Sequence, residues 1–156
     1  MPDNLEGLIA AYKVGLRRSE AARARGGTHR YGWKPSTDRQ RYVDGMSAVA
    51  EWLVTEATGR EWLSNGLVPD PSSEDVSGGI SVRWTERDNG SLIIYAHDDA
   101  PYSALVTGDH WNLRVRGYIH TDVGKNKNFW REDVRSPAYF VPQHQLLPIT
   151  ELRLAP

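Results

Sequence analysis

Apolar residues recur at helical spacing near the beginning of the chain. They are Leu5, Leu8, Ile9, Tyr12 and Leu16. This spacing predicts an amphipathic helix over roughly residues 3–24. Gly26-Gly27 follows it as a terminator.

A second helical pattern follows the polar, aromatic and basic loop of residues 28–37. Its apolar positions are Val43, Met46, Ala50, Leu53 and Ala57. Asp38 is suited to cap the amino-terminal end of this helix, and Gly59 stands where helices commonly end. We therefore predict a helix over 38–58 and a connection over 64–79, which is rich in proline, serine and glycine.

Beyond residue 79 the pattern changes to short runs typical of strands, which are β-branched or apolar and bounded by turn residues. The predicted strands are 80–86, 91–96, 102–107 and 113–120. Asp88-Asn89-Gly90 predicts a hairpin between the first and second of these strands, and Gly108-Asp109-His110 predicts a hairpin between the third and fourth. Residues 121–136 indicate a loop or short helix, residues 139–141 an edge strand, and the tail is expected to pack on the core. The chain is predicted to form a single α+β domain over residues 1–156.

Composition narrows the class of protein. The chain has 156 residues, 39% hydrophobic and 25% charged, which is the ordinary globular range. The absence of cysteine excludes disulfides and thiolate metal sites. Without an apolar run of bilayer length or a signal-peptide pattern, we expect a cytoplasmic protein with no membrane partner.

The net charge of −1 conceals a strong asymmetry along the chain. Residues 12–42 carry nine basic and two acidic side chains, a net charge of +7, and residues 43–100 carry three basic and eleven acidic ones, a net charge of −8. A metal-dependent enzyme acting on a phosphate polymer could use such an arrangement. A solvated charged helix next to an acidic surface would give the same charge pattern along the sequence.

The stretch from Asp75 to Arg83 carries the clearest chemical pattern. Asp75 leads through Gly78-Gly79 into a strand on which Ser81 and Arg83 share one face. Glu51 lies on the flank of the second helix's apolar stripe. Carboxylates that hold Mg²⁺ beside a cation are what phosphodiester hydrolysis requires.

The order of Glu51 on a helix, then Asp75, then Ser81 and Arg83 on a strand resembles the PD-(D/E)XK nuclease superfamily. The pattern of that superfamily is a helix bearing glutamate, then an aspartate, then a strand reading acidic-x-Lys. The chain also resembles uncharacterised phage-type proteins through Ala50-Glu51, residues 75–83, residues 98–108 and residues 137–148. The resemblance covers about residues 40–150. It implies a restriction-endonuclease-like core over 38–156, of the three-layer α/β type with a mixed four- to five-stranded sheet, preceded by a basic segment over 1–37.

The resemblance also implies roles for individual residues. Glu51 and Asp75 match the metal-binding carboxylates, and Arg83 stands where the superfamily has lysine. Ser81 replaces the second strand carboxylate, so Mg²⁺ affinity should fall, and Arg83 cannot act as a base. Glu74 or Glu86 could compensate. Each residue also has a structural interpretation: Glu51 as a salt-bridged or solvated side chain, Asp75 as a turn residue, and Arg83 as the ion-pair partner of either.

Two functional interpretations follow. The chain is a Mg²⁺-dependent endonuclease acting on DNA, or a catalytically inactive relative that binds nucleic acid or protein. Where nucleic acid is the partner, basic side chains of the amino-terminal segment would contact the phosphate backbone. These are Arg17, Arg18, Arg23, Arg25, Arg30 and Lys34. Tyr31 and Trp33 could stack on bases. The Asp98-Asp99 pair is interpreted as a polar loop.

Overall fold

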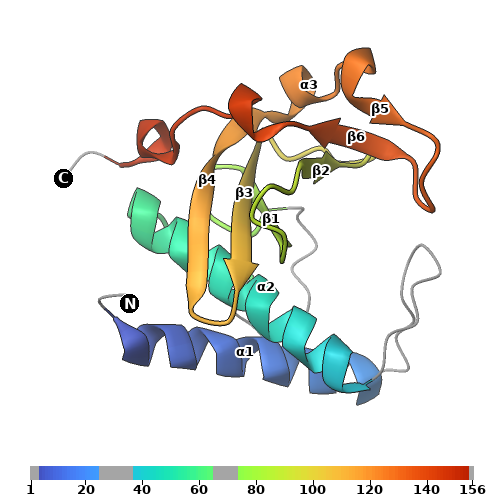
Figure 1. Ribbon diagram of the computed structural model, residues 1–156. Coiled ribbons are helices and arrows are strands. Elements are labelled where there is room, and N and C mark those ends of the chain that lie inside the picture. Colours follow the sequence, from blue (N-terminus) through green and yellow to red (C-terminus); the bar gives the residue numbers. More distant parts are fainter. Residues whose placement is uncertain (1–3, 25–36, 65–73, 155–156) are drawn as a thin grey trace.

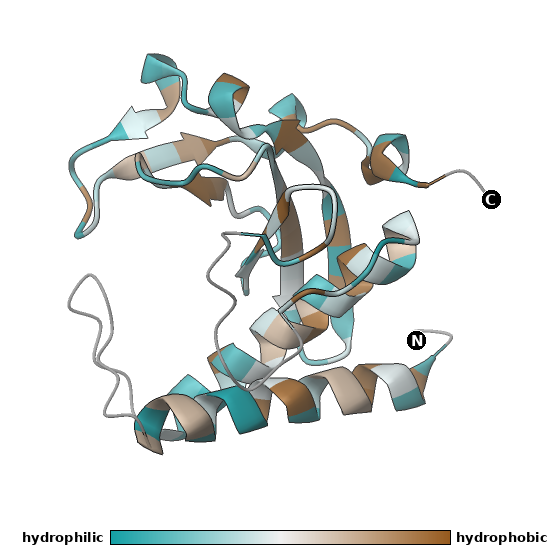
Figure 2. Cartoon of the chain, turned by 180° about the vertical axis from the view of Figure 1, so that it is seen from behind, coloured by the Kyte–Doolittle hydropathy of each residue, from teal (hydrophilic) through white to brown (hydrophobic). Residues whose placement is uncertain are grey.

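The computed structural model describes residues 4–24, 37–64 and 74–154. Its two long helices come first, and the strands follow with short helices among and after them (Figure 1). Helix α1 spans Leu5–Ala24 and helix α2 spans Thr37–Thr58, close to the predicted bounds. In Figure 2 both helices carry hydrophobic as well as hydrophilic residues, as expected for amphipathic elements.

The buried face of α1 is made of small residues together with one leucine. It consists of Leu8, Ala11, Gly15 and Ser19. A Cβ atom at Gly15 would lie 2.3 Å from the carbonyl oxygen of Asp44, so the two helix backbones approach each other closely at this point. Leu5 and Ile9, which the spacing placed on the apolar stripe, are 39% and 38% exposed. Close helix packing therefore selects the face with the smallest side chains.

Strands β1 (Ile80–Thr85), β3 (Tyr102–Asp109) and β4 (Asn112–His120) form a mixed sheet in the order β1-β3-β4. The β3–β4 pair is antiparallel and closes between Asp109 and Asn112, which confirms the second predicted hairpin. Strand β1 instead runs parallel to β3, with Ile80 opposite Tyr102. The predicted hairpin between β1 and the next strand is therefore wrong.

A second small sheet contains β2 (Leu92–Ile94), β6 (Ala138–Val141) and β5 (Trp130–Arg131) in the order β2-β6-β5. The predicted edge strand is thus the central strand of this sheet. After β1 the chain turns away toward this sheet, and the Gln143 side chain donates hydrogen bonds to the carbonyl oxygens of Asp88 (2.7 Å) and Gly90 (2.9 Å). A turn signal fixes where the chain reverses, but the pairing partner depends on which apolar face must be covered.

The mixed sheet is covered on both faces, in three layers. Helix α2 covers one face, where Ala50 and Val54 pack with Ala104 and Val106. On the other face Leu105 and Ile119 pack with residues of the second sheet. The third layer is therefore largely β rather than helical, with the four-residue helix α3 (Thr121–Gly124) beside it. The fold class is α+β, as predicted.

Short 3-10 helices occupy Lys127–Phe129, Gln143–Gln145 and Ile149–Leu152. The last of these returns to α2: the backbone N–H of Leu154 donates to the carbonyl oxygen of Thr58 at 2.9 Å, and Leu152 is buried in the core beneath. The tail thus packs on the core as expected. Among the helices of the described residues, none combines the length and apolarity needed to cross a bilayer.

Candidate functional site

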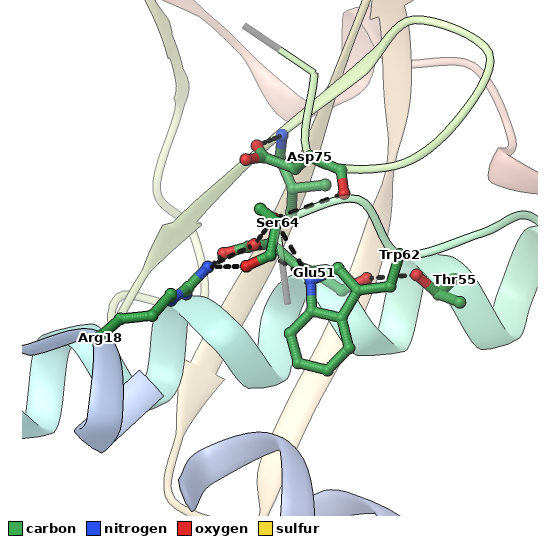
Figure 3. Close-up of polar contacts among 7 residues, drawn as sticks. Arg18, Glu51, Thr55, Trp62, Ser64 and Asp75 are labelled. Carbon is green, nitrogen blue, oxygen red and sulfur yellow. Dashed lines mark hydrogen bonds and ion pairs between the residues drawn. The ribbon is translucent and has the colours of Figure 1, made fainter. Parts of the chain in front are cut away.

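The fold brings Glu51 and Asp75 together from different parts of the chain (Figure 3). Glu51 lies in the middle of α2 and is 5% exposed. Asp75 lies just before β1, in a turn where Gly78 and Gly79 have φ of +88° and +85°. This left-handed conformation favours glycine, and it directs the chain back so that the Asp75 N–H donates to the Ile80 carbonyl oxygen at 2.9 Å.

Three side chains donate hydrogen bonds to the Glu51 carboxylate. Arg18 of α1 forms a two-pronged ion pair, with one guanidinium nitrogen 3.0 Å from Oε1 and the other 3.0 Å from Oε2. The indole N–H of Trp62 lies 3.2 Å from Oε1, and the Ser64 hydroxyl donates to the same oxygen. The buried charge of Glu51 is therefore neutralised and well hydrogen-bonded within the protein.

Backbone N–H groups donate hydrogen bonds both to the carbonyl oxygen of Asp75 and to its carboxylate. Its carbonyl oxygen accepts from the N–H of Leu63 at 2.9 Å, and its carboxylate Oδ2 accepts from the N–H of Val82 at 2.7 Å. Burial, and then the charge of Glu51, raise the pKa of Asp75 to about 7 against the opposing effects of the Val82 N–H, Arg83 and Arg18. Two carboxylates in one buried region thus share limited positive charge.

Ser81 and Arg83 lie on the face of β1 opposite α2. Ile80, Val82 and Trp84 pack into the cluster that contains Ala50 of α2. Because side chains alternate along a strand, Ser81 and Arg83 point to the other face. Ser81 is buried there at 8% exposure, and Arg83 is 36% exposed. The fold therefore brings Glu51 and Asp75 together, whereas Ser81 and Arg83 lie on the other face of β1, from which the charge of Arg83 still acts to lower the pKa of Asp75.

Arg83 forms its ion pair with Asp98. The distance from its guanidinium to Oδ2 of Asp98 is 2.8 Å, and its guanidinium carbon lies 5.6 Å from the centre of the Tyr95 ring. Asp98 also accepts from the backbone N–H of Tyr95 at 2.8 Å, and Lys125 donates to the Asp98 carbonyl oxygen. The Asp98 loop, interpreted from sequence as polar, therefore holds the arginine that stands at the position of the superfamily's lysine.

Sequence reasoning missed the residues that complete the Glu51 environment: Arg18, Trp62 and Ser64. Arg18 was assigned to nucleic-acid contacts with its neighbours, but its side chain turns inward, where it is 22% exposed. Burial lowers the pKa of Arg18, but the hydrogen bond to Glu51 and the charges of Glu51 and Asp75 outweigh burial and raise it. Arg18 follows Gly15 by three residues and so lies on the same side of α1, but the burial of Gly15 became known only from the structure.

The other basic candidates have different placements. Arg17 and Arg23 are exposed on α1, whereas Arg25, Arg30 and Lys34, and the stacking candidates Tyr31 and Trp33, lie outside the described residues. Of the acidic residues considered as substitutes for a missing ligand, Glu86 pairs with Arg39 at 2.9 Å.

The residues present do not fit the Mg²⁺ site that the resemblance implies. Proteins usually hold Mg²⁺ through one or two carboxylates whose oxygens are free to coordinate it, together with several water molecules. Both carboxylate oxygens of Glu51 already accept hydrogen bonds from Arg18. Ser81 stands where the resemblance requires the second metal-binding carboxylate. Within residues 4–24, 37–64 and 74–154, no three His, Cys, Asp or Glu side chains are grouped to hold a metal ion.

Comparison of the chain with protein-family models, with curated proteins and with solved structures finds no match.

Proposed function

We propose that the chain is a nuclease-like protein that binds nucleic acid, with DNA as the expected partner, and does not cleave it. The observation that supports this proposal is the two-pronged Arg18–Glu51 ion pair at the position where the resemblance requires a metal ligand. A carboxylate bonded in this way does not offer its oxygens to Mg²⁺ without first losing a buried ion pair, which costs several kcal/mol.

Exposed basic side chains on α1 support the binding half of the proposal. Lys13, Arg17 and Arg23 are exposed along this helix. The sequence continues the series with Arg25, Arg30 and Lys34, within the stretch of net charge +7. Cations that displace counterions from a phosphate backbone provide affinity without sequence readout. A nuclease-like fold with a neutralised carboxylate site would retain this capacity.

A Mg²⁺-dependent DNA endonuclease is the second candidate. It is favoured by the meeting of Glu51 and Asp75 and by the raised pKa of Asp75, about 7, since perturbed carboxylates cluster at catalytic sites. The two candidates differ in whether the purified protein breaks phosphodiester bonds.

Incubation with plasmid and with single-stranded DNA, in Mg²⁺ and in Mn²⁺, separates the two candidates. We expect DNA to be shifted in a gel but to remain intact with either metal. Cleavage by the wild-type protein that disappears in Asp75→Ala would reject the non-catalytic proposal in favour of the endonuclease. A protein that neither binds nor cuts either DNA would reject both.

The binding surface has its own test. We expect the triple variant Lys13→Ser, Arg17→Ser, Arg23→Ser, which removes three exposed cations of α1, to bind DNA more weakly. The slope of log affinity against log salt should fall by about 1 for each phosphate that the variant no longer neutralises. The matched control removes three other cations, Arg114, Lys127 and Arg135, which are exposed elsewhere. Equal weakening in both variants would show that net charge, and not the α1 surface, provides the binding.

A further inference from the structure

The guanidinium of Arg18 lies among three oxygen atoms. Two belong to the Glu51 carboxylate, each 3.0 Å away, and the third is the carbonyl oxygen of Ser64 at 2.6 Å (Figure 3). Carboxylate and carbonyl oxygens are also the ligand types that a hard divalent cation takes. Arg18 therefore holds a position of the kind that a metal would hold.

We infer that Arg18 is a built-in cation that replaces a divalent metal ion at the Glu51–Asp75 carboxylate pair and so keeps the site metal-free. This inference rests on the proposed nuclease-like ancestry of the site, and it assigns Arg18 to the interior of the protein instead of to nucleic acid. It accounts in one step for the poor fit to Mg²⁺ and for the two-pronged pairing of Glu51.

Charge balance supports the inference. Glu51 and Asp75 are buried close enough for the charge of Glu51 to raise the pKa of Asp75, and the charges of Arg83 and then Arg18 act in the opposite direction. Of these two cations, Arg18 is the one that is bonded to Glu51. Removing a buried carboxylate's cationic partner leaves an uncompensated charge, which is strongly destabilising. A fold without metal at this place therefore needs a cation from its own chain. Guanidinium suits the task because its planar set of donors matches a carboxylate in two-pronged geometry.

The close packing of α1 brings Arg18 to this position. Gly15, one turn earlier, allows the backbone of α1 to approach α2 at Asp44 and Gly45. Ser19, the next residue, is 1% exposed and lies at the same interface. Because the helix is fixed on both sides of position 18, the guanidinium is directed toward Glu51 with limited freedom.

The test measures thermal stability with and without Mn²⁺ at millimolar concentration. We expect the wild-type melting temperature to be unchanged by Mn²⁺. Arg18→Met keeps much of the aliphatic stem and removes the charge, so we expect its melting temperature to fall by several degrees and to be partly restored by Mn²⁺. In the double variant Arg18→Met, Asp75→Asn we expect this restoration to disappear. Arg17→Met, an exposed neighbour, is the control and should show neither effect.

Two outcomes would overturn the inference. One is an Arg18→Met protein that folds and does not respond to Mn²⁺. The other is saturable Mn²⁺ binding by the wild-type protein, measured by electron paramagnetic resonance and abolished in Asp75→Asn, since the metal would then bind with Arg18 in place. The wild-type titration decides even where Arg18→Met fails to fold. DNA binding is read in separate assays, so failure of the proposed function and failure of this inference are distinguishable.

Discussion

At the scale of single residues, the two carboxylates singled out in the sequence do meet, but their partners come from elsewhere. Glu51 was recognised by its place on a helix flank and Asp75 by the glycines that follow it. The arginine that pairs with Glu51 is Arg18, which lies 33 positions away in the chain, whereas Arg83 pairs with Asp98 and acts on Asp75 only through its charge. Such a pairing depends on how two helices dock, and no local pattern encodes it.

Asp75 gives the first prediction, a pH dependence of stability. The pKa of Asp75 is raised from 3.8 to about 7 in the folded state, so between these pH values the folded protein keeps a proton on Asp75 that the unfolded chain has lost. The stability that this protonated carboxyl contributes is therefore lost as the pH rises through this range. Asp75→Asn removes the effect. We expect the stability of this variant relative to wild type to increase by about 1–3 kcal/mol from about pH 5 to about pH 8.

Urea unfolding at several pH values provides the measurement. Glu56→Gln, which removes an exposed carboxylate of the same helix as Glu51, is the control and should follow the wild-type profile. A constant difference in stability between Asp75→Asn and wild type across the pH range would show that Asp75 ionises normally in the folded protein.

At the scale of elements, hydrophobic spacing located the helices and strands well but not their contacts. It predicted α1 and α2 to within a few residues, and it predicted β1 and the β3–β4 hairpin. It did not predict that β1 pairs with β3 in parallel, because strand pairing is a long-range choice that depends on which apolar faces the helices and the second sheet cover.

The crossing of α1 and α2 gives the second prediction. A Cβ atom at Gly15 would stand 2.3 Å from the backbone carbonyl oxygen of Asp44, and backbone atoms cannot yield as a flexible side chain can. We therefore expect Gly15→Ala to cost about 1–3 kcal/mol in free energy of unfolding, despite the higher helix propensity of alanine.

The control for this change is Lys13→Ala, an exposed substitution on the same helix that should alter stability little. Chemical denaturation measures both variants. A Gly15→Ala variant as stable as Lys13→Ala would mean that the helices do not approach as closely as described.

At the scale of the whole molecule, both faces of one sheet are covered and the tail closes one end of the core. Leu152 packs with Ala50 and Val54 although about a hundred residues separate them. The Arg60 side chain also donates to the Leu152 carbonyl oxygen at 2.8 Å. Because α2 contacts the last residues, we expect the described ranges to unfold as one cooperative unit.

The tail gives the third prediction. Leu152 is 6% exposed and Leu154 is 49% exposed, so the same truncation should have different consequences at the two positions. We expect Leu152→Ala to cost about 2–4 kcal/mol and Leu154→Ala to lie within about 0.5 kcal/mol of wild type. Thermal and chemical unfolding should show one transition in each case. A second transition in Leu152→Ala would indicate that the tail unfolds separately from the core.

The sequence by itself determined most of the secondary structure and the α+β class, and it pointed to Glu51 and Asp75 as candidate site residues. It could do so because periodicity, turn chemistry and the glycine pair before β1 act over a few residues. The tertiary structure alone decided that β1 pairs with β3, that β6 is central in a second sheet, and that Arg18 neutralises Glu51. These contacts join residues distant in the chain, and their free energy depends on burial and close packing, which no local pattern contains.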